Sequence, residues 1–265
     1  MATKNVLAID LGNESGRVVN VAFDGEKLTA RTRYRFMNHA ITVGGVLHRD
    51  VLNFFQHIQD GIIHATQDTP VDGVGVASFG VDFGLLDARG RLLANPVHMR
   101  DSRTDGIAAQ VHAQVSEQEL FRRTGVASHP INTLFQLAAL VRDDDWQLQH
   151  AHTLLTMPNL VNYWLTGETL SEFTHSTTTQ CYSPGSGTWD AALLEQLDIP
   201  AHIFPQIVPP GECIGSYRDV PVYSVASHDT ASAVVAVPAE SERFAYCSSG
   251  TWSLFGLEVD APITS

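Results

Sequence analysis

The chain has 265 residues, of which 44% are hydrophobic and 17% are charged, and this composition is typical of a globular protein with a substantial core. Its 16 Lys and Arg against 29 Asp and Glu give a formal net charge of -13. That charge excludes general binding to nucleic acid or to an anionic membrane, because both need basic surface. It is compatible with one small phosphate-bearing ligand, since backbone N–H groups can hold a phosphate locally.

Other features narrow the class of protein. The cysteines are far apart and form no CxxC pair, which favours a reducing compartment over a disulfide framework. No signal-peptide core precedes Asp10 and no apolar run approaches the length of a membrane span, so we expect a cytoplasmic protein. His57, His64 and the HAH sequence at 150–152 match no metal-ligand pattern, and we expect solvated or locally paired histidines.

Three antiparallel strands are predicted to open the chain. Residues 5–12, NVLAIDLG, are apolar and end at a glycine, as a buried strand does. Residues 16–36 predict two further strands, joined by an Asp-Gly turn, the strongest short-range signal for a hairpin. Residues 50–67 then have apolar side chains at helical spacing, and Asp50 is expected to cap this helix.

The middle of the chain combines short strands with a long helical stretch. Residues 74–78 and 83–87 predict two buried strands. The interval 101–167 is expected to be mainly helical, and residues 176–190 are expected to form a polar loop. A short helix is predicted at 191–199.

The last part returns to strands. A connector with Pro and Gly at 204–215 precedes a strand at 220–227 and a helix at 230–237. Residues 244–260 predict two strands around a Ser-Gly turn. This order is that of an α/β protein with a mixed sheet and a helical insertion, and not that of an alternating Rossmann chain.

The first candidate site is the turn DLGNESGR at residues 10–17. Its glycines permit tight backbone angles, and successive N–H groups can form a nest for a phosphate. Asp10, at the strand end, can hold a water of Mg²⁺, because that ion takes few protein ligands. Taken alone, this stretch fits an ordinary hairpin turn equally well.

Three more stretches have both a chemical and a structural interpretation. SSGTWS at 248–253 can bring N–H groups to a phosphate from the opposite side, or it is a simple hairpin turn. The glycine in SFGVDF at 78–83 permits close approach of a ligand, or it marks a β-bulge. In SHDT, Ser227 or Asp229 can cap the helix that follows, or Asp229 can present its carboxylate to a reacting hydroxyl.

Together these stretches meet the needs of phosphoryl transfer: cradled phosphates, a metal ion and a carboxylate that deprotonates the accepting hydroxyl. The sequence has no GxxxxGK[ST] P-loop and no protein-kinase catalytic loop. It resembles the FGGY carbohydrate kinases of the actin-like ATPase superfamily. The motifs that carry the resemblance lie in family order over nearly the whole chain: AIDLGNESGR, SFGVDFGLLD, RDSRT, NTLFQL, MPNLVNYWLTG, TTTQ, ASHDTASAV and SSGTWSL.

The resemblance implies a ribonuclease H-like α/β fold, a mixed sheet with a helical insertion, and it implies roles for particular residues. Asp229 is implied to be the catalytic proton acceptor. The positions implied to bind the sugar are Gly80, His228, Asp229 and Thr230. The positions implied to bind ATP are Asp10, Gly12, Asn13, Glu14, Ser15, Gly16, Arg17, Gly250 and Thr251, and Asp10 is also implied to contact Mg²⁺ through water. Arg49 departs from the family, since relatives often have a tryptophan near the sugar there.

A domain division and a reaction are also implied. Family members are longer, so residues 1–238 are expected to form the N-terminal sugar-binding domain and residues 239–265 the beginning of a truncated nucleotide-binding domain. The implied reaction transfers the γ-phosphoryl group of MgATP to the 1-hydroxyl of L-rhamnulose. ATP and Mg²⁺ are the implied cofactors, and a small ketose and ATP are the implied partners, with no nucleic acid and no membrane.

Alternatives remain open at this stage. The substrate can be another ketose such as L-fuculose, or the chain can be a non-catalytic sugar-binding domain. An actin-like structural ATPase is disfavoured, because SFGVDF and SHDT are sugar-kinase features. We expect little or no turnover from this chain alone, and the exposed edge of its last strands can pair with another chain.

Overall fold

A mixed six-stranded sheet forms the centre of the molecule in the computed structural model, which describes residues 2–250 and 252–264. The strand order is β13-β14-β6-β1-β2-β3. These strands are β1 (Lys4–Leu11), β2 (Ser15–Phe23), β3 (Leu28–Met37), β6 (Gly73–Ser78), β13 (Cys213–Tyr217) and β14 (Val220–Tyr223). The first three strands are antiparallel, as predicted, whereas β6 lies parallel to both β1 and β14.

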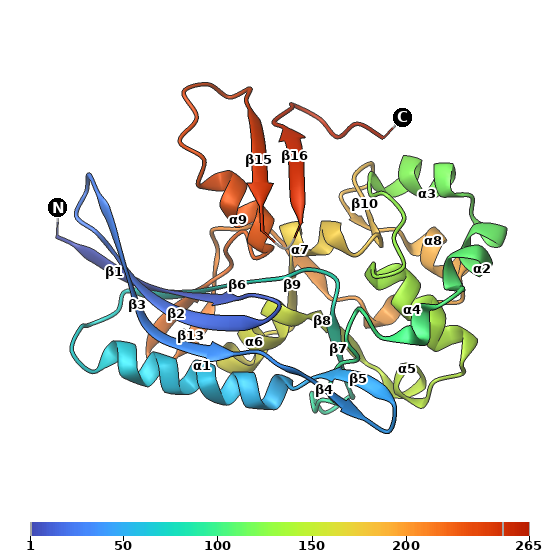
Figure 1. Cartoon of the computed structure of the whole chain (residues 1–265), viewed down its shortest axis with the longest axis horizontal. Coiled ribbons are helices and arrows are strands. Elements are labelled where there is room, and N and C mark those ends of the chain that lie inside the picture. The colour runs from blue at the N-terminus through green and yellow to red at the C-terminus, as the bar shows by residue number, and fades with distance from the viewer. Residues whose placement is uncertain (1, 251, 265) are drawn as a thin grey trace.

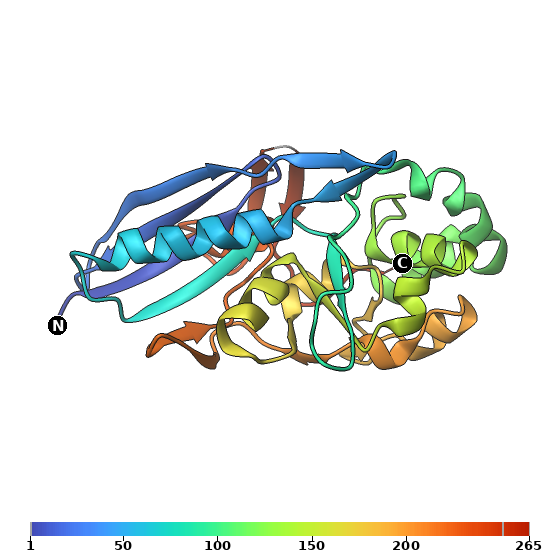
Figure 2. The same cartoon turned by 90° about the horizontal axis from the view of Figure 1, so that it is seen from below.

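Helices cover one face of this sheet. Leu7, Ile9 and Leu11 of β1 point to that face and are almost fully buried, because successive side chains of a strand alternate between the two faces. They pack with α1 (Val51–Thr66) and α6 (Met157–Thr166), and Figure 2 shows α1 lying along the sheet. The side chain of Asp50 caps α1, as predicted, by accepting a hydrogen bond from the N–H of Asn53.

A second, mostly helical lobe lies beside the sheet, on the right of Figure 1. Its core is a separate cluster of buried side chains that includes Leu120, Leu134, Phe135, Leu137 and Leu193. The helices of this lobe are α2 (Ile107–Gln114), α3 (Glu117–Thr124), α4 (Thr133–Arg142), α5 (Trp146–His150) and α8 (Ala191–Gln196), with 3-10 turns at Ser102–Thr104 and Ala201–Ile203.

In the described part of the chain, four short strand pairs lie outside the central sheet and upstream of the last hairpin. The pairs are β4 (Ala40–Val43) with β5 (Val46–Arg49), β7 (Phe83–Leu86) with β8 (Thr153–Thr156), β9 (Leu170–Glu172) with β12 (Gln206–Val208), and β10 (Tyr182–Ser183) with β11 (Thr188–Trp189). Two short helices lie near the centre of Figure 1: α7 (Phe173–Thr178), between the sheet and the helical lobe, and α9 (Asp229–Val235), beside β15.

The sequence-based elements differ from the structure in places. The interval 101–167 contains strand β8, because a short apolar run such as TLLT cannot be told from a buried helical segment by periodicity. The expected loop at 176–190 begins with the end of α7 and includes the β10–β11 pair. The connector at 204–215 contains β12 and the first residues of β13. The strand expected at 220–227 ends at Tyr223, before the chain turns toward α9.

The last strands form a hairpin of their own. Strands β15 (Ala245–Ser249) and β16 (Ser253–Leu257) pair with each other and not with the central sheet, and Figure 1 shows them apart from it. This confirms the predicted pair of strands around a Ser-Gly turn. Phe255 is 84% exposed and Leu257 is 69% exposed, so the hairpin presents a large apolar surface. Among the described residues, no helix is long and apolar enough to cross a membrane.

The contact between α1 and the sheet generates a stability prediction. A methyl group at Gly61 would lie 2.5 Å from Cγ2 of Val18, far inside van der Waals contact. We expect Gly61→Ala to lower the free energy of unfolding by about 1–3 kcal/mol, because overpacking outweighs the gain in helix propensity. Urea denaturation measures it.

The matched control is Asn53→Ala, at an exposed position of the same helix. Without a packing clash, this change should be neutral or stabilise by a few tenths of a kcal/mol, about the difference in helix propensity. Stabilisation by Gly61→Ala would contradict the close approach of α1 to β2.

Candidate active site

Four turns meet at one cavity of about 1280 Å³. They follow β1, β6, β14 and β15, so segments from both ends of the chain line the same space. The sequence-predicted site residues among the lining are Asp10, Gly12, Asn13, Arg17, Gly80, His228, Asp229, Thr230 and Gly250. The structure therefore brings together most of the residues that the sequence singled out.

The first turn joins β1 to β2 and is tightly closed. The N–H of Gly12 donates to the carbonyl of Ser15 over 2.9 Å. Asn38 holds the turn from outside, because its side-chain amide donates to the Gly12 carbonyl and its N–H donates to the Glu14 carbonyl. Gly16 is buried under Phe36, where a methyl group would lie 2.2 Å from the ring, so this glycine is needed for packing.

Asp10 and Arg17 form an ion pair at the cavity wall. Nε of Arg17 donates to the Asp10 carboxylate over 2.7 Å across the β1–β2 pair. The Arg17 side chain is 48% exposed and that of Asp10 is 35% exposed, so both remain accessible from the cavity. An anion that approaches Arg17 therefore competes with a carboxylate that is already in place.

The second turn, between β6 and β7, holds its backbone in an uncommon conformation. Val81 has a φ of 68°, in the left-handed region that a β-branched residue rarely adopts. Its carbonyl accepts hydrogen bonds from Oγ1 of Thr133 over 2.7 Å and from Nε2 of Gln136 over 3.1 Å. Such a conformation persists only where the surroundings impose it, and it often occurs in ligand-binding turns.

Gly80 in this turn lies close to the third turn. A methyl group at Gly80 would lie 3.4 Å from Oγ1 of Thr178 and 3.5 Å from Nε2 of His228. The glycine therefore leaves its backbone open to the cavity between those two side chains.

The third turn, between β14 and α9, is anchored by the buried carboxylate of Glu172. This side chain is 1% exposed and accepts hydrogen bonds from both the N–H and the hydroxyl of Ser227, over 3.1 and 2.6 Å. It also accepts from Thr174 and from the N–H of His175 at the start of α7. The hydroxyl of Thr174 in turn accepts the N–H of His228. Glu172 thus fixes α7 and the third turn relative to each other.

This network excludes Ser227 as the cap of α9 and leaves Asp229 open to both interpretations of SHDT. The Ser227 hydroxyl donates to Glu172 and does not cap α9. Asp229 does accept the N–H of Thr230, over 2.7 Å, but its side chain is 44% exposed and lines the cavity. The carboxylate can therefore serve the first turn of α9 and still reach a ligand.

His228 lies beside this carboxylate, with Nε2 3.4 Å from Oδ1 of Asp229. Burial lowers the pKa of His228, and the negative charges of Asp229 and Glu172 oppose that shift only in part. The imidazole is therefore neutral near pH 7, so it can both donate and accept a hydrogen bond to a hydroxyl group in the cavity.

Behind the cavity wall, Arg49 and Asp82 form a fully buried ion pair. Nε of Arg49 donates to Oδ2 of Asp82 over 2.7 Å, and both side chains are 0% exposed. Burial lowers the pKa of Arg49 and raises that of Asp82, and the pairing opposes both shifts. Arg49 does not line the cavity.

Some predicted site residues lie outside the cavity lining. Glu14 is exposed, Ser15 lies in β2 and Gly16 is buried, so these residues shape the first turn while their roles toward ATP stay predictions. Thr251 lies outside the described residues. Gly250 lines the cavity, and its N–H donates to the carbonyl of Trp252 over 2.8 Å.

Sequence reasoning missed several supporting residues. Glu172 is a single carboxylate with no distinctive spacing, and Asp82 lies in the SFGVDF motif without a role assigned to it; only their burial reveals the part they play. His175 is also fully buried and meets His228 edge to face, with ring centroids 5.9 Å apart. Thr178 of the TTTQ motif lines the cavity, but the sequence of that motif does not indicate which of its threonines would do so.

Comparisons with known proteins agree with this geometry. Residues 5–235 match the FGGY family of carbohydrate kinases, N-terminal domain. The chain is 39% identical over 279 residues to a rhamnulokinase of Pectobacterium atrosepticum, covering 100% of this chain and 55% of that protein. It is 39% identical over 267 residues to a rhamnulokinase of Yersinia pestis, covering 98% of this chain and 55% of that protein. The chain thus spans about half the length of the curated relatives it matches.

Solved structures share the fold. A carbohydrate kinase from Novosphingobium aromaticivorans superposes with a TM-score of 0.81 at 23% identity, over 100% of this chain and 58% of that one. A ligand-bound xylulose kinase from Lactobacillus acidophilus gives a TM-score of 0.75 at 20% identity, over 84% of this chain and 48% of that one. These likenesses confirm the predicted fold class.

The Glu172 network generates the second prediction. Glu172→Gln should lower the free energy of unfolding by about 1–3 kcal/mol, because the amide group leaves at least one buried donor without an acceptor. Chemical denaturation measures it. Glu168→Gln, at an exposed position nearby, is the matched control and should change stability by less than about 0.5 kcal/mol. Equal effects of the two changes would contradict the anchoring role.

Two buried histidines predict acid sensitivity. Burial lowers the pKa of His175 to about 3 and that of His98 to about 4, from an ordinary value of 6.5. Below pH 6.5 the unfolded chain therefore binds more protons than the folded one. Each histidine should lower the free energy of unfolding by about 1.4 kcal/mol per pH unit as the pH falls toward its folded pKa.

Urea denaturation between pH 7 and pH 5 tests this dependence. His98→Gln should make the slope with pH shallower, whereas His150→Gln, at an exposed position, should leave the slope unchanged. A stability that does not change over this range in the unsubstituted chain would show that the two imidazoles are not held neutral.

Proposed function

Because this chain belongs to the FGGY family of carbohydrate kinases, we propose that it forms the sugar-binding part of a kinase for a ketose. The reaction transfers the γ-phosphoryl group of MgATP to the 1-hydroxyl of L-rhamnulose and gives L-rhamnulose 1-phosphate. The choice of L-rhamnulose rests on the likeness to the two rhamnulokinases. The single observation that carries the proposal is the exposed Asp229 carboxylate, which shares one cavity with the turn at Gly12 and Asn13.

Asp229 is the general base in this proposal. As the 1-hydroxyl oxygen attacks the phosphorus atom, its proton moves to the Asp229 carboxylate, and ADP leaves with the bonding electrons of the broken P–O bond. Neutral His228 and the open backbone at Gly80 hold other hydroxyl groups of the sugar. Thr230 follows the base in the first turn of α9 and lines the same cavity.

The turns after β1 and β15 hold the phosphates in this proposal. Asn13 of the first of these turns and Gly250 of the second line the cavity, and Arg17 lines the same cavity. Asp10 fits a magnesium ion that is held through water, because it offers a carboxylate at the cavity wall and Mg²⁺ takes few protein ligands. Mg²⁺ neutralises the charge of the phosphates when bound.

We also propose the domain division at residue 238. Residues 1–238 contain both large cores and the sugar-side turns, whereas both strands of the separate β15–β16 hairpin lie after residue 238. The exposed apolar surface of that hairpin supports its assignment to the start of a nucleotide-binding domain. Since this chain spans 55% of its curated relatives, we expect weak ATP binding and little turnover from the 265 residues alone.

Ketose binding gives the first test. At about 100 times its dissociation constant, a ligand stabilises the folded state by about 2.7 kcal/mol. L-Rhamnulose should therefore raise the midpoint of thermal unfolding by roughly 5–10 °C. L-Fuculose should raise it less. Asp229→Asn should reduce the shift, because the amide is a weaker acceptor for a sugar hydroxyl, whereas Asp105→Asn, exposed and outside the cavity, should not.

An ADP-release assay with MgATP decides between the kinase and the alternatives. Protection by a ketose with ADP release at background supports a sugar-binding part whose catalysis needs more of the protein. Turnover that Asp229→Asn lowers by about 10²–10⁴-fold would mean that these residues suffice for catalysis. A larger shift with L-fuculose would reassign the substrate, and protection by neither ketose would contradict the proposal.

A further inference from the structure

Arg49 is a buried cation that bonds to two of the cavity turns at once. It ends β5, and its side chain is 0% exposed. It lines no part of the cavity, so it can act on a bound ligand only through other residues. Its contacts divide between the turn after β1 and the turn after β6.

On the side of the first turn, Arg49 bonds to Asn13. Nη1 donates to the Asn13 carbonyl over 3.0 Å, and Nη2 donates to the side-chain oxygen over 2.5 Å. The planar guanidinium thus fixes both the backbone and the side chain of a residue that lines the cavity.

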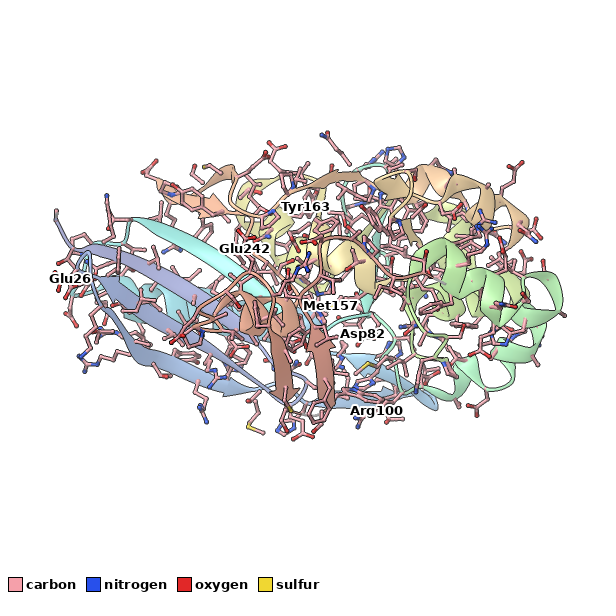
Figure 3. The ribbon with its side chains drawn as sticks, turned by 90° about the horizontal axis from the view of Figure 1, so that it is seen from above. Glu26, Asp82, Arg100, Met157, Tyr163 and Glu242 are labelled. Carbon is pink, nitrogen blue, oxygen red and sulfur yellow. The ribbon has the colours of Figure 1, made fainter. Side chains whose placement is uncertain are left out.

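On the side of the second turn, Arg49 bonds to Asp82 and covers Phe79. Nε donates to Oδ2 of Asp82, and the guanidinium carbon lies 4.2 Å from the centre of the Phe79 ring. Phe79 lines the cavity next to Gly80. Figure 3 labels Asp82 near the middle of the molecule, between the central sheet and the helical lobe.

The base of Arg49 is rigid. Its N–H donates to the carbonyl of Pro96 over 2.8 Å, and its backbone pairs with Ala40 in the β4–β5 hairpin. The next residue, Asp50, caps α1. A movement of either turn relative to this backbone therefore has to break bonds to the guanidinium.

We propose that Arg49 is a positioning residue that couples the two turns, so that a ketose bound against residues 79–81 also orders the turn at residues 12–16. The inference rests on the proposed function, and it adds communication between the sugar side and the phosphate side of the cavity. Such coupling aligns the acceptor with the donor, since phosphoryl transfer depends on the positioning of both. It is reciprocal, so a phosphate ligand at residues 12–16 favours ketose binding by the same factor.

A backbone contact offers a competing route between the turns. The N–H of Phe79 donates to the carbonyl of Leu11 over 3.1 Å. A sugar can also touch Asn13 directly, because both turns line the cavity. Neither route depends on the guanidinium, so a change at Arg49 separates them from the proposed coupling.

Hydrogen–deuterium exchange of the whole chain, with and without L-rhamnulose or L-fuculose, tests the proposal. In the unsubstituted chain, the ketose should slow exchange of the amides at 79–82, at 227–230 and at 12–16, each by about fivefold or more. Arg49→Lys keeps a cation beside Asp82 but lacks the planar fork that bonds Asn13. In this variant, slowing should persist at 79–82 and 227–230 but fall below about twofold at 12–16.

Two further variants keep the test decisive if Arg49→Lys folds poorly. Asn13→Ala removes the side-chain acceptor and leaves the buried Arg49–Asp82 pair intact, and it should give the same selective loss at 12–16. Arg123→Lys is the matched control, because Arg123 also bonds an aspartate, Asp190, but lies outside the cavity lining. It should leave all the ketose effects unchanged.

The outcomes are distinct. Slowing at 12–16 that survives both Arg49→Lys and Asn13→Ala overturns the coupling and leaves the proposed function standing. If the ketose slows amide exchange only at 79–82 in the unsubstituted chain, the coupling is also overturned and the proposed function again stands. No slowing at any of the three turns with either ketose overturns the proposed function and, with it, this inference.

Discussion

Parallel pairing of β1, β6 and β14 is the constraint on which the site depends. In this pairing, Leu11 lies opposite Ser78, and the N–H of Ser78 donates to the carbonyl of Ser227 over 2.8 Å. Since parallel strands end at the same edge of a sheet, the turns that follow them meet there. Backbone hydrogen bonds therefore set the spacing between the turn after β1, the Gly80 turn and the turn that carries Asp229. The side chains refine an arrangement that the sheet has already made.

Two buried charges stiffen that arrangement from behind. Glu172 bonds both to the Asp229 turn and to α7, and Arg49 bonds both to the turn after β1 and to the Gly80 turn. A buried charge is costly to desolvate, and it is tolerated only where several hydrogen bonds satisfy it. Both charges meet this condition, and both have partners from segments that are distant in the sequence. The cavity wall is thus held by hydrogen bonds as well as by apolar contacts. Because hydrogen bonds are directional, they restrict how the wall can pack.

Helices cover one face of the central sheet, and the other face borders the cavity. The side chains of Leu7 and Ile9 pack with helices α1 and α6, whereas those of Ala8 and Asp10 project from the other face of β1, which borders the cavity. The β15–β16 hairpin contributes Gly250 to that cavity and exposes Phe255 and Leu257. This asymmetry agrees with a chain that spans about half the length of its curated relatives. In the proposed division, the face that borders the cavity belongs, with the hairpin, to the boundary with a second domain.

Local patterns by themselves determined much of this protein. The Asp-Gly hairpin, the helix after Asp50, the strand endings at Gly12 and Ser78, and the family of the chain all follow from short stretches, because turn chemistry, caps and periodicity act over a few residues. Only the tertiary structure revealed strand β8, the anchoring carboxylate of Glu172 and the bridge made by Arg49. A single Glu or Arg carries no periodic signal, and its role comes from burial and from partners that are far away in sequence. Burial and distant partners depend on how the strands pair. The tertiary structure alone therefore decided which charged side chains bond to the turns of the site.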